Sequence, residues 1–222
     1  IPDGEARVQA LLTGQIHMNR YVPFAQKKIF DGNSKFDVSV VPTGNWRGMV
    51  MRTDTAPFDN PKVRKAVRLA VDRQELVDLV MGGAATVACD TPVAPSDQYR
   101  LDMSCPQNIS KAKNLLREAG YPNGIEMVIH VSTKEPTWPT IGEVLQQQLA
   151  KANIKAEVKM TPSKSYWKET WMKKPVAMTR WNERPADSAL HEIYHSGAKW
   201  NESYFKDPDF DANLASARGE LD

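Results

Sequence analysis

Apolar runs and amphipathic stretches alternate through the second half of the chain, and this alternation limits the fold more than any other feature. Residues 126–131, 155–160 and 176–181 have the composition of strands, and helical periodicity separates them at residues 141–152 and 163–173. Parallel strands need a crossover connection of about a dozen residues or more, usually a helix. The sequence therefore predicts an α/β domain with a mostly parallel sheet flanked by helices.

The first half of the chain and its C-terminal region add further elements to this pattern. Two more strands are expected, at residues 36–41 and 46–51. Helices are expected at residues 5–13, 23–30, 61–71, 72–80, 110–119, 186–196 and 208–218. Residues 84–107 contain prolines and both cysteines without any periodicity, so we expect a long ordered loop there.

Charge and hydropathy exclude several classes of protein. The 29 basic and 27 acidic residues are spread along the whole chain, and the mean hydropathy is -0.51. No run of like charges indicates a nucleic-acid-binding arm or a membrane-surface helix, and the longest apolar stretch, at residues 80–89, is too short to cross a bilayer. The chain begins without a methionine or a signal peptide, so we expect it to be a piece of a longer protein.

One enzyme motif is present, the H-E-x-x-H pattern formed by His191, Glu192 and His195. On a helix, two such imidazoles hold zinc and the glutamate acts as a general base. A zinc enzyme also needs a third protein ligand, which the spacing of the remaining residues does not offer, and the expected helix ends close to Gly197. No other catalytic motif is found. We therefore expect no catalytic residue, metal or cofactor, and a zinc peptidase remains the alternative function.

The two cysteines, Cys89 and Cys105, lie in the same expected loop. In an oxidising compartment such a pair forms a disulfide, whereas in the cytosol it consists of two buried thiols. Composition leaves both interpretations open.

Tryptophans are the remaining chemical signal. Trp46, Trp138 and Trp181 are expected at strand ends or in loops. Ligands of parallel α/β sheets bind at the carboxyl ends of strands, where an indole offers a flat apolar contact. Packing in the core is the alternative for each of them. Trp167 and Trp171 lie one helical turn apart, which is more typical of core packing or of a surface groove.

Several short motifs together resemble one protein family. Residues 56–66, APFDNPKVRKA, are similar to the PPF-D-x-x-VR-x-A signature of the family 5 extracellular solute-binding proteins, the dipeptide, oligopeptide and nickel binding group. Residues 112–124, AKNLLREAGYPNG, resemble the family's AK-x-LL-x-EAGYP-x-G pattern. The stretches at residues 1–16, 148–155, 195–197 and 207–211 resemble further family motifs. All occur in the family's order across essentially the whole chain.

The resemblance implies a periplasmic-binding-protein-like fold of type II, in which two lobes joined by crossover strands enclose the ligand. Residues 1–44 would lead from the first lobe through the crossover, and residues 45–222 would form the second α/β lobe. The N-terminal lobe of the same chain would be missing here. A periplasmic or extracytoplasmic location is implied, and in that compartment we predict that Cys89 and Cys105 form a disulfide.

The function that the resemblance implies is that of the substrate-binding component of an ABC importer. Such a protein binds a peptide-like or other small solute in the interlobe cleft and delivers it to the permease subunits. A cytoplasmic regulatory domain of similar fold is a further alternative. Nucleic acid and insertion into a membrane are not expected.

Arg184 is the main departure from the family's pattern. After the corresponding strand, peptide binders of the family often carry GW-x-x-D, whose aspartate pairs with the amino terminus of the peptide. Here the segment is RWNER, with Trp181 retained and Arg184 at the position of the aspartate. A guanidinium favours a carboxylate or a phosphate, unless it pairs with a local acid such as Glu183 or Asp187. The expected ligand-binding residues are Trp46, Arg47, Thr133, Trp138, Trp181, Asn182 and Arg184.

Overall fold

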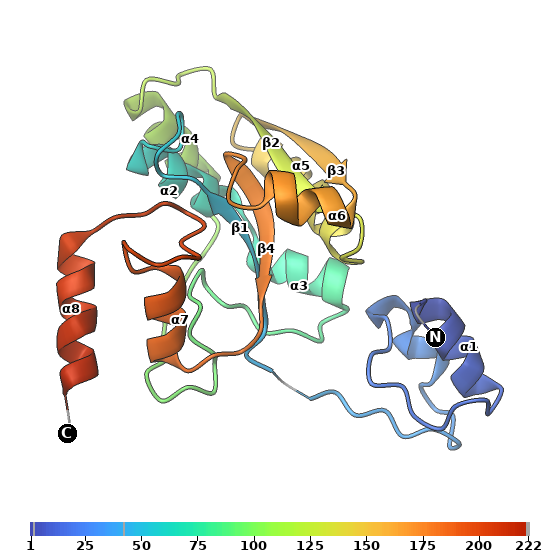
Figure 1. The fold of residues 1–222 in the computed structure, drawn as a ribbon. Coiled ribbons are helices and arrows are strands. Elements are labelled where there is room, and N and C mark those ends of the chain that lie inside the picture. Colours follow the sequence, from blue (N-terminus) through green and yellow to red (C-terminus); the bar gives the residue numbers. More distant parts are fainter. Residues whose placement is uncertain (2, 42, 221–222) are drawn as a thin grey trace. The chain divides into compact units, whose positions relative to one another are not determined.

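The computed structural model describes residues 1, 3–41 and 43–220 (Figure 1). The chain forms two compact units. The first consists of Ile1–Pro42 and Glu75–Thr86, and the second of Thr43–Gln74 and Val87–Asp222. The expected assignment of residues 1–44 and 45–222 to two parts of a two-lobed protein stays a prediction.

The first unit is mostly helix and irregular chain. α1 (Gly4–Leu12) begins at Asp3, whose side chain accepts a hydrogen bond from the backbone N–H of Ala6, and it buries Val8. The segment expected as a helix at residues 23–30 is a 3-10 helix (Phe24–Ile29).

The strand expected at residues 36–41 is not formed, and this prediction was wrong. The run alternates apolar and polar residues, but none of the described strands pairs with it. Its side chains are largely exposed, with Val40 at 53% and Val41 at 69%. Alternation alone does not make a strand, because the backbone also needs a hydrogen-bonding neighbour.

A four-stranded sheet lies at the centre of the second unit, and its strand order is β1-β4-β2-β3. The strands are β1 (Trp46–Met51), β2 (Ile125–Ser132), β3 (Ile154–Thr161) and β4 (Val176–Trp181). β2 pairs in parallel with both β3 and β4, whereas β1 runs antiparallel to β4 at the edge. The expected α/β fold with a mostly parallel sheet is confirmed.

Helices flank this sheet. They are α2 (Pro61–Ala70), α4 (Ile109–Glu118), α5 (Trp138–Ala150), α7 (Ala186–Ile193) and α8 (Pro208–Gly219), and α3 (Arg73–Met81) precedes the long loop. α5 packs against β2 and β3 so closely that a Cβ on Gly142 would lie 2.9 Å from Val158. α7 and α8 lie side by side (Figure 1), linked by a 2.7 Å ion pair between Asp187 and Arg218. In the described part of the chain no helix has both the length and the apolar character needed to cross a bilayer.

The helix expected at residues 163–173 is shorter and irregular. It consists of one turn, α6 (Ser163–Ser165), and a π-helical turn (Tyr166–Thr170). The buried Tyr166 hydroxyl donates to backbone carbonyl oxygens of the sheet, at Met178 and at His130. These contacts hold the π-helical turn against the sheet. Because they join distant segments, the local periodicity of the sequence does not reveal them.

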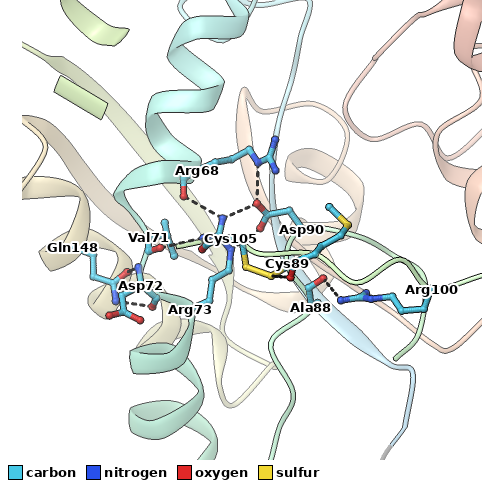
Figure 2. Close-up of polar contacts among 11 residues, drawn as sticks. Arg68, Val71, Asp72, Arg73, Ala88, Cys89, Asp90, Arg100, Cys105 and Gln148 are labelled. Carbon is cyan, nitrogen blue, oxygen red and sulfur yellow. Dashed lines mark hydrogen bonds and ion pairs between the residues drawn. A yellow bond between two sulfur atoms is a disulfide. The ribbon is translucent and has the colours of Figure 1, made fainter. Parts of the chain in front are cut away.

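The long loop before α4 is held at its base by a disulfide and an ion-pair network (Figure 2). Cys89 and Cys105 form the disulfide, with Cα atoms 5.4 Å apart. The neighbouring Asp90 accepts hydrogen bonds from Arg73 at 2.6 Å and from Arg68 at 2.8 Å. Arg73 also donates to the backbone carbonyl of Cys105 at 3.2 Å. The covalent bond and the ion pairs therefore constrain the same two ends of the loop.

Candidate functional site

The candidate site lies at the edge of the sheet where β2, β3 and β4 end. Because these strands are parallel, their carboxyl ends meet at one edge, and the antiparallel β1 begins there. Trp46, the first residue of β1, is the register partner of Trp181, the last residue of β4. Their ring centroids are 6.5 Å apart. The sheet thus brings together two of the predicted tryptophans at the edge where α/β proteins usually bind ligands.

Trp200 and Arg184 complete this cluster. The Trp200 ring centroid lies 5.7 Å from that of Trp181. The Arg184 guanidinium carbon lies 5.3 Å from the centroid of Trp181 and 5.7 Å from that of Trp200, within the range of cation–π attraction. All four side chains are half-buried. We call Trp46, Trp181, Trp200 and Arg184 the edge surface.

Arg184 is not free within the edge surface. Its Nη1 forms a 2.6 Å ion pair with Oε2 of Glu192, which comes from α7. A local acid was the alternative considered above, but the partner is neither Glu183 nor Asp187. The Ser188 hydroxyl donates to the other Glu192 oxygen at 3.0 Å. An anionic ligand would therefore compete with Glu192 for Nη1, since the Arg184 Nε is buried and has no hydrogen-bond partner among the described residues.

Two residues here were missed by the sequence analysis, Trp200 of the edge surface and the buried Glu202. The Glu202 side chain is buried beneath the edge surface, and the residue is 4% exposed. The Trp171 indole N–H donates to Oε2 at 2.6 Å, and the Trp181 indole N–H donates to Oε1. Burial raises the pKa of Glu202, and the interactions of its carboxylate with Thr179 and the two indoles only partly oppose this effect. No local sequence signal identifies this residue, because its partners are 21 and 31 positions away.

Two arginines lie on the opposite face of the same strand pair. Successive residues of a strand point to opposite faces, so Arg47 and Arg180 alternate with the paired tryptophans. They are register partners, and like charges placed opposite each other are destabilising unless balanced. Glu135 accepts from Arg180 Nε at 2.8 Å. The exposed Arg47 forms no ion pair within the described part of the chain.

The remaining predicted site residues differ in position. Thr133 and Asn182 are exposed just after β2 and β4, at the expected edge. Trp138 was expected in a loop, but it is the first residue of α5 and is 0% exposed. Its ring packs against Tyr166 and Trp167, with centroid distances of 5.4 and 6.2 Å. No surface of Trp138 is left for a ligand to contact, so we do not include it in the site.

The H-E-x-x-H segment does not adopt the helical geometry on which the zinc interpretation depends. α7 ends before His195, whose Nδ1 accepts a hydrogen bond from the backbone N–H of Gly197 at 3.0 Å. The rings of His191 and His195 are 5.3 Å apart, while Glu192 is engaged by Arg184. Among the described residues no group of three or more potential metal ligands is found. The absence of a metal stays a prediction.

The long loop closed by the Cys89–Cys105 disulfide helps to position the candidate site. Asp97, within the loop, accepts a hydrogen bond at 3.0 Å from the backbone N–H of Ala186, the first residue of α7. Gly44 packs against both the loop and the segment that leads into α7, because a Cβ at this position would lie 2.7 Å from Ala94 of the loop and 2.6 Å from Glu183. The loop therefore helps to position α7, the helix that carries the ion-pair partner of Arg184.

A hollow at the opposite edge of the sheet was also considered. It is lined by residues that precede β2 and β3, including Tyr121, Gly124 and Asn153, and by residues of α4 such as Asn114 and Arg117. It therefore lies at the amino ends of the strands, whereas ligands of such sheets bind at the carboxyl ends. We do not regard it as the candidate site.

Comparison with known proteins links this chain to binding proteins. The family described as bacterial extracellular solute-binding proteins, family 5 Middle, matches residues 1–201. The glutathione-binding protein GsiB of Pectobacterium atrosepticum is 30% identical over 232 residues, covering 98% of this chain and 45% of GsiB. GsiB of Escherichia coli strain K12 is 35% identical over 159 residues, covering 71% of this chain and 31% of the relative. The chain thus spans less than half the length of these relatives.

Solved structures show the same fold. The periplasmic binding protein DppA of Helicobacter pylori, in complex with the peptide STSA, has a TM-score of 0.85 at 24% identity and matches all of this chain with 45% of its own. AgaA from A. tumefaciens R10, in complex with agropinic acid, has a TM-score of 0.84 at 25% identity, with 47% of its chain matched. The fold is that of a type II periplasmic binding protein, and the matched relatives are binding proteins rather than enzymes. The chain belongs to the bacterial extracellular solute-binding proteins of family 5.

Proposed function

We propose that the protein containing this chain is the substrate-binding component of an ABC importer, and that the edge surface is one wall of its solute site. The observation that carries this proposal is the cluster of Trp46, Trp181, Trp200 and Arg184 at the carboxyl edge of the sheet. Half-buried aromatic rings beside a cation provide flat apolar contact together with one polar anchor, as small-molecule sites do. The missing N-terminal lobe would supply the opposite wall of an interlobe cleft.

The proposed solute is peptide-like or another small molecule with an anionic group. Glutathione is the ligand named for GsiB, and a peptide and agropinic acid are those of DppA and AgaA. Arg47, Arg180 and Arg184 gather at this end of the β1–β4 pair, where Glu135 and Glu192 each neutralise one guanidinium. Arg47 has no ion pair among the described residues but lies on the opposite face of the strands, so Arg184 is the cation of the edge surface that favours a negatively charged group on the solute.

Delivery of the solute to permease subunits, in the periplasm or another extracytoplasmic compartment, is part of the same proposal. The family supports this role, and the Cys89–Cys105 disulfide fits an oxidising compartment. Closure of the two lobes around the solute would present both lobes to the permease.

The decisive experiment identifies the solute. The ligand that co-purifies with the full-length protein is released and identified by mass spectrometry. Calorimetry then measures the binding of glutathione, the peptide STSA and agropinic acid to the ligand-free protein. We expect one solute class to bind with micromolar or tighter affinity, and Trp181→Ala to weaken it. Stoichiometric zinc together with peptidase activity, or the absence of binding to any of these solutes and of any co-purified ligand, would contradict the proposal.

A further inference from the structure

Glu202 is a buried acid whose two oxygens each accept a hydrogen bond from a different tryptophan. Trp171 follows the π-helical turn, and Trp181 ends β4, so one carboxylate joins two separate elements. Each indole has a single N–H donor, and both donors are used on this one group. When the Glu202 carboxylate is ionised, these hydrogen bonds are stronger than bonds between neutral groups.

The bond to Glu202 restrains the orientation of the Trp181 ring. The indole N–H points down to the buried carboxylate, while the ring contacts Trp46, Trp200 and Arg184 of the edge surface. We propose that Glu202 is a positioning residue of the edge surface, holding the Trp181 indole in one orientation through a carboxylate that is itself held by Trp171. The part of this proposal that concerns solute binding rests on the proposed function. The part that concerns the indoles does not.

The turn that carries Glu202 is secured by other groups, so it does not depend on the carboxylate. The Asn201 side-chain amide donates to the backbone carbonyls of His195 and Phe205, at 3.3 and 2.6 Å. The backbone N–H and the hydroxyl of Thr53 both donate to the carbonyl of Ser203, at 2.8 and 3.1 Å. Replacement of the Glu202 side chain should therefore leave the backbone of this turn in place.

Titration of Glu202 separates a positioning role from a purely structural one. Because burial raises its pKa, the folded state favours the protonated acid, and the stability contributed by this preference is lost as the pH rises through the raised pKa. Removing the charge should therefore not destabilise the protein at neutral pH. Of the ionisable groups that interact with Glu202, Tyr166 and Tyr194 have raised pKa values and stay neutral. Arg184 packs on the ring of Trp181.

The first experiment observes the indole N–H groups of the full-length protein labelled with ¹⁵N-tryptophan. Trp171→Phe and Trp181→Phe assign the two NMR resonances. We expect both resonances to shift together in one acid titration, with an apparent pKa above that of an ordinary glutamate. Glu202→Gln has one acceptor oxygen and no ionisable proton, so at least one indole resonance should move and neither should titrate. Glu126→Gln, at an exposed glutamate of β2, is the matched control and should change neither.

Glu202→Leu removes both acceptors and tests the link to the solute. With glutathione as the probe, we expect Glu202→Leu and Trp181→Phe each to weaken binding about 5- to 30-fold, without additional loss in the double variant. If Glu202→Leu does not fold, Glu202→Gln takes its place in the same cycle. Indole resonances that ignore both pH and Glu202→Gln would overturn the positioning role, as would losses that add fully. If the wild-type protein does not bind glutathione, that solute is ruled out while the NMR result still decides the role of Glu202.

Discussion

Arg184 makes two kinds of contact that have opposite consequences for the binding of an anionic solute. Its stacking on Trp181 and Trp200 keeps the guanidinium at the edge surface, whereas its ion pair with Glu192 already neutralises the charge. Side chains of the pair are 30% and 36% exposed, so the attraction is screened and the pair is weak enough to exchange. The pair can therefore open when a ligand carboxylate arrives with better geometry.

We predict that Arg184→Ala weakens the binding of an anionic solute about 10-fold or more, because a hydrogen bond between charged groups is lost. Glu192→Gln should strengthen the binding of the same solute, since it releases the Arg184 guanidinium from its ion pair. Calorimetry on the full-length protein measures both changes. Equal effects of Arg184→Ala on anionic and neutral solutes would show that Arg184 acts through packing on the tryptophans and not through its charge.

At the scale of elements, the long loop and α7 form one support for the candidate site. The disulfide and Asp90 hold the ends of the loop (Figure 2). Asp97, within the loop, accepts a hydrogen bond from the start of α7. α7 in turn carries Glu192. Disturbance at the base of the loop should therefore reach Arg184 through α7.

Replacement of both cysteines by serine tests the covalent part of this support. For a loop of this length, the chain-entropy model gives a loss of about 3 kcal/mol of unfolding free energy. Because Arg73 and Asp90 hold the same ends, we expect the folded loop to persist and solute affinity to change little. Denaturant unfolding and calorimetry check the two parts. A large loss of affinity with the disulfide removed would show that the ion pairs alone do not hold the loop.

Acid should weaken the same support through Asp90. Burial by itself would raise the pKa of Asp90, but the hydrogen bonds and charges of Arg73 and Arg68 outweigh it and lower the pKa below the ordinary value of 3.8. A lowered pKa stabilises the folded state above pH 3.8, and this contribution is lost as the pH falls through the lowered value. We predict that Asp90→Asn is less stable than wild type at neutral pH and loses part of its dependence on acid. Unfolding curves at a series of pH values test this, with Asp102→Asn, at an exposed loop residue, as the control.

At the scale of the whole molecule, the edge surface is open and requires an opposite wall to exclude water. The chain covers 45% of the length of its relative from P. atrosepticum. A ligand touching one wall loses many of its contacts and remains hydrated on its other side. We predict that residues 1–222 alone bind the solute at least 100-fold more weakly than the full-length protein does. Equal affinities by calorimetry would place the complete site within this chain.

The sequence by itself determined most of the local elements, the strand expected at residues 36–41 and the regular helix expected at residues 163–173 being the exceptions. The strands expected at residues 46–51 and 176–181 coincide with β1 and β4, and the helix expected at residues 110–119 corresponds to α4. Family motifs were equally readable, because they are continuous in the chain. Periodicity, capping and motifs depend on neighbours within a few positions, so no tertiary information is needed to recognise them.

The sequence proposed Trp46, Trp181 and Arg184 as site residues, but only the tertiary structure decided which side chains come together. Trp46 meets Trp181 because β1 runs antiparallel to β4, and Glu202 lies between two indoles that are distant in sequence. Trp138, expected at the surface, turns inward because α5 begins at that residue and packs on the sheet. These outcomes depend on strand order and on the packing of helices, which arise from contacts between distant segments and leave no local pattern in the chain.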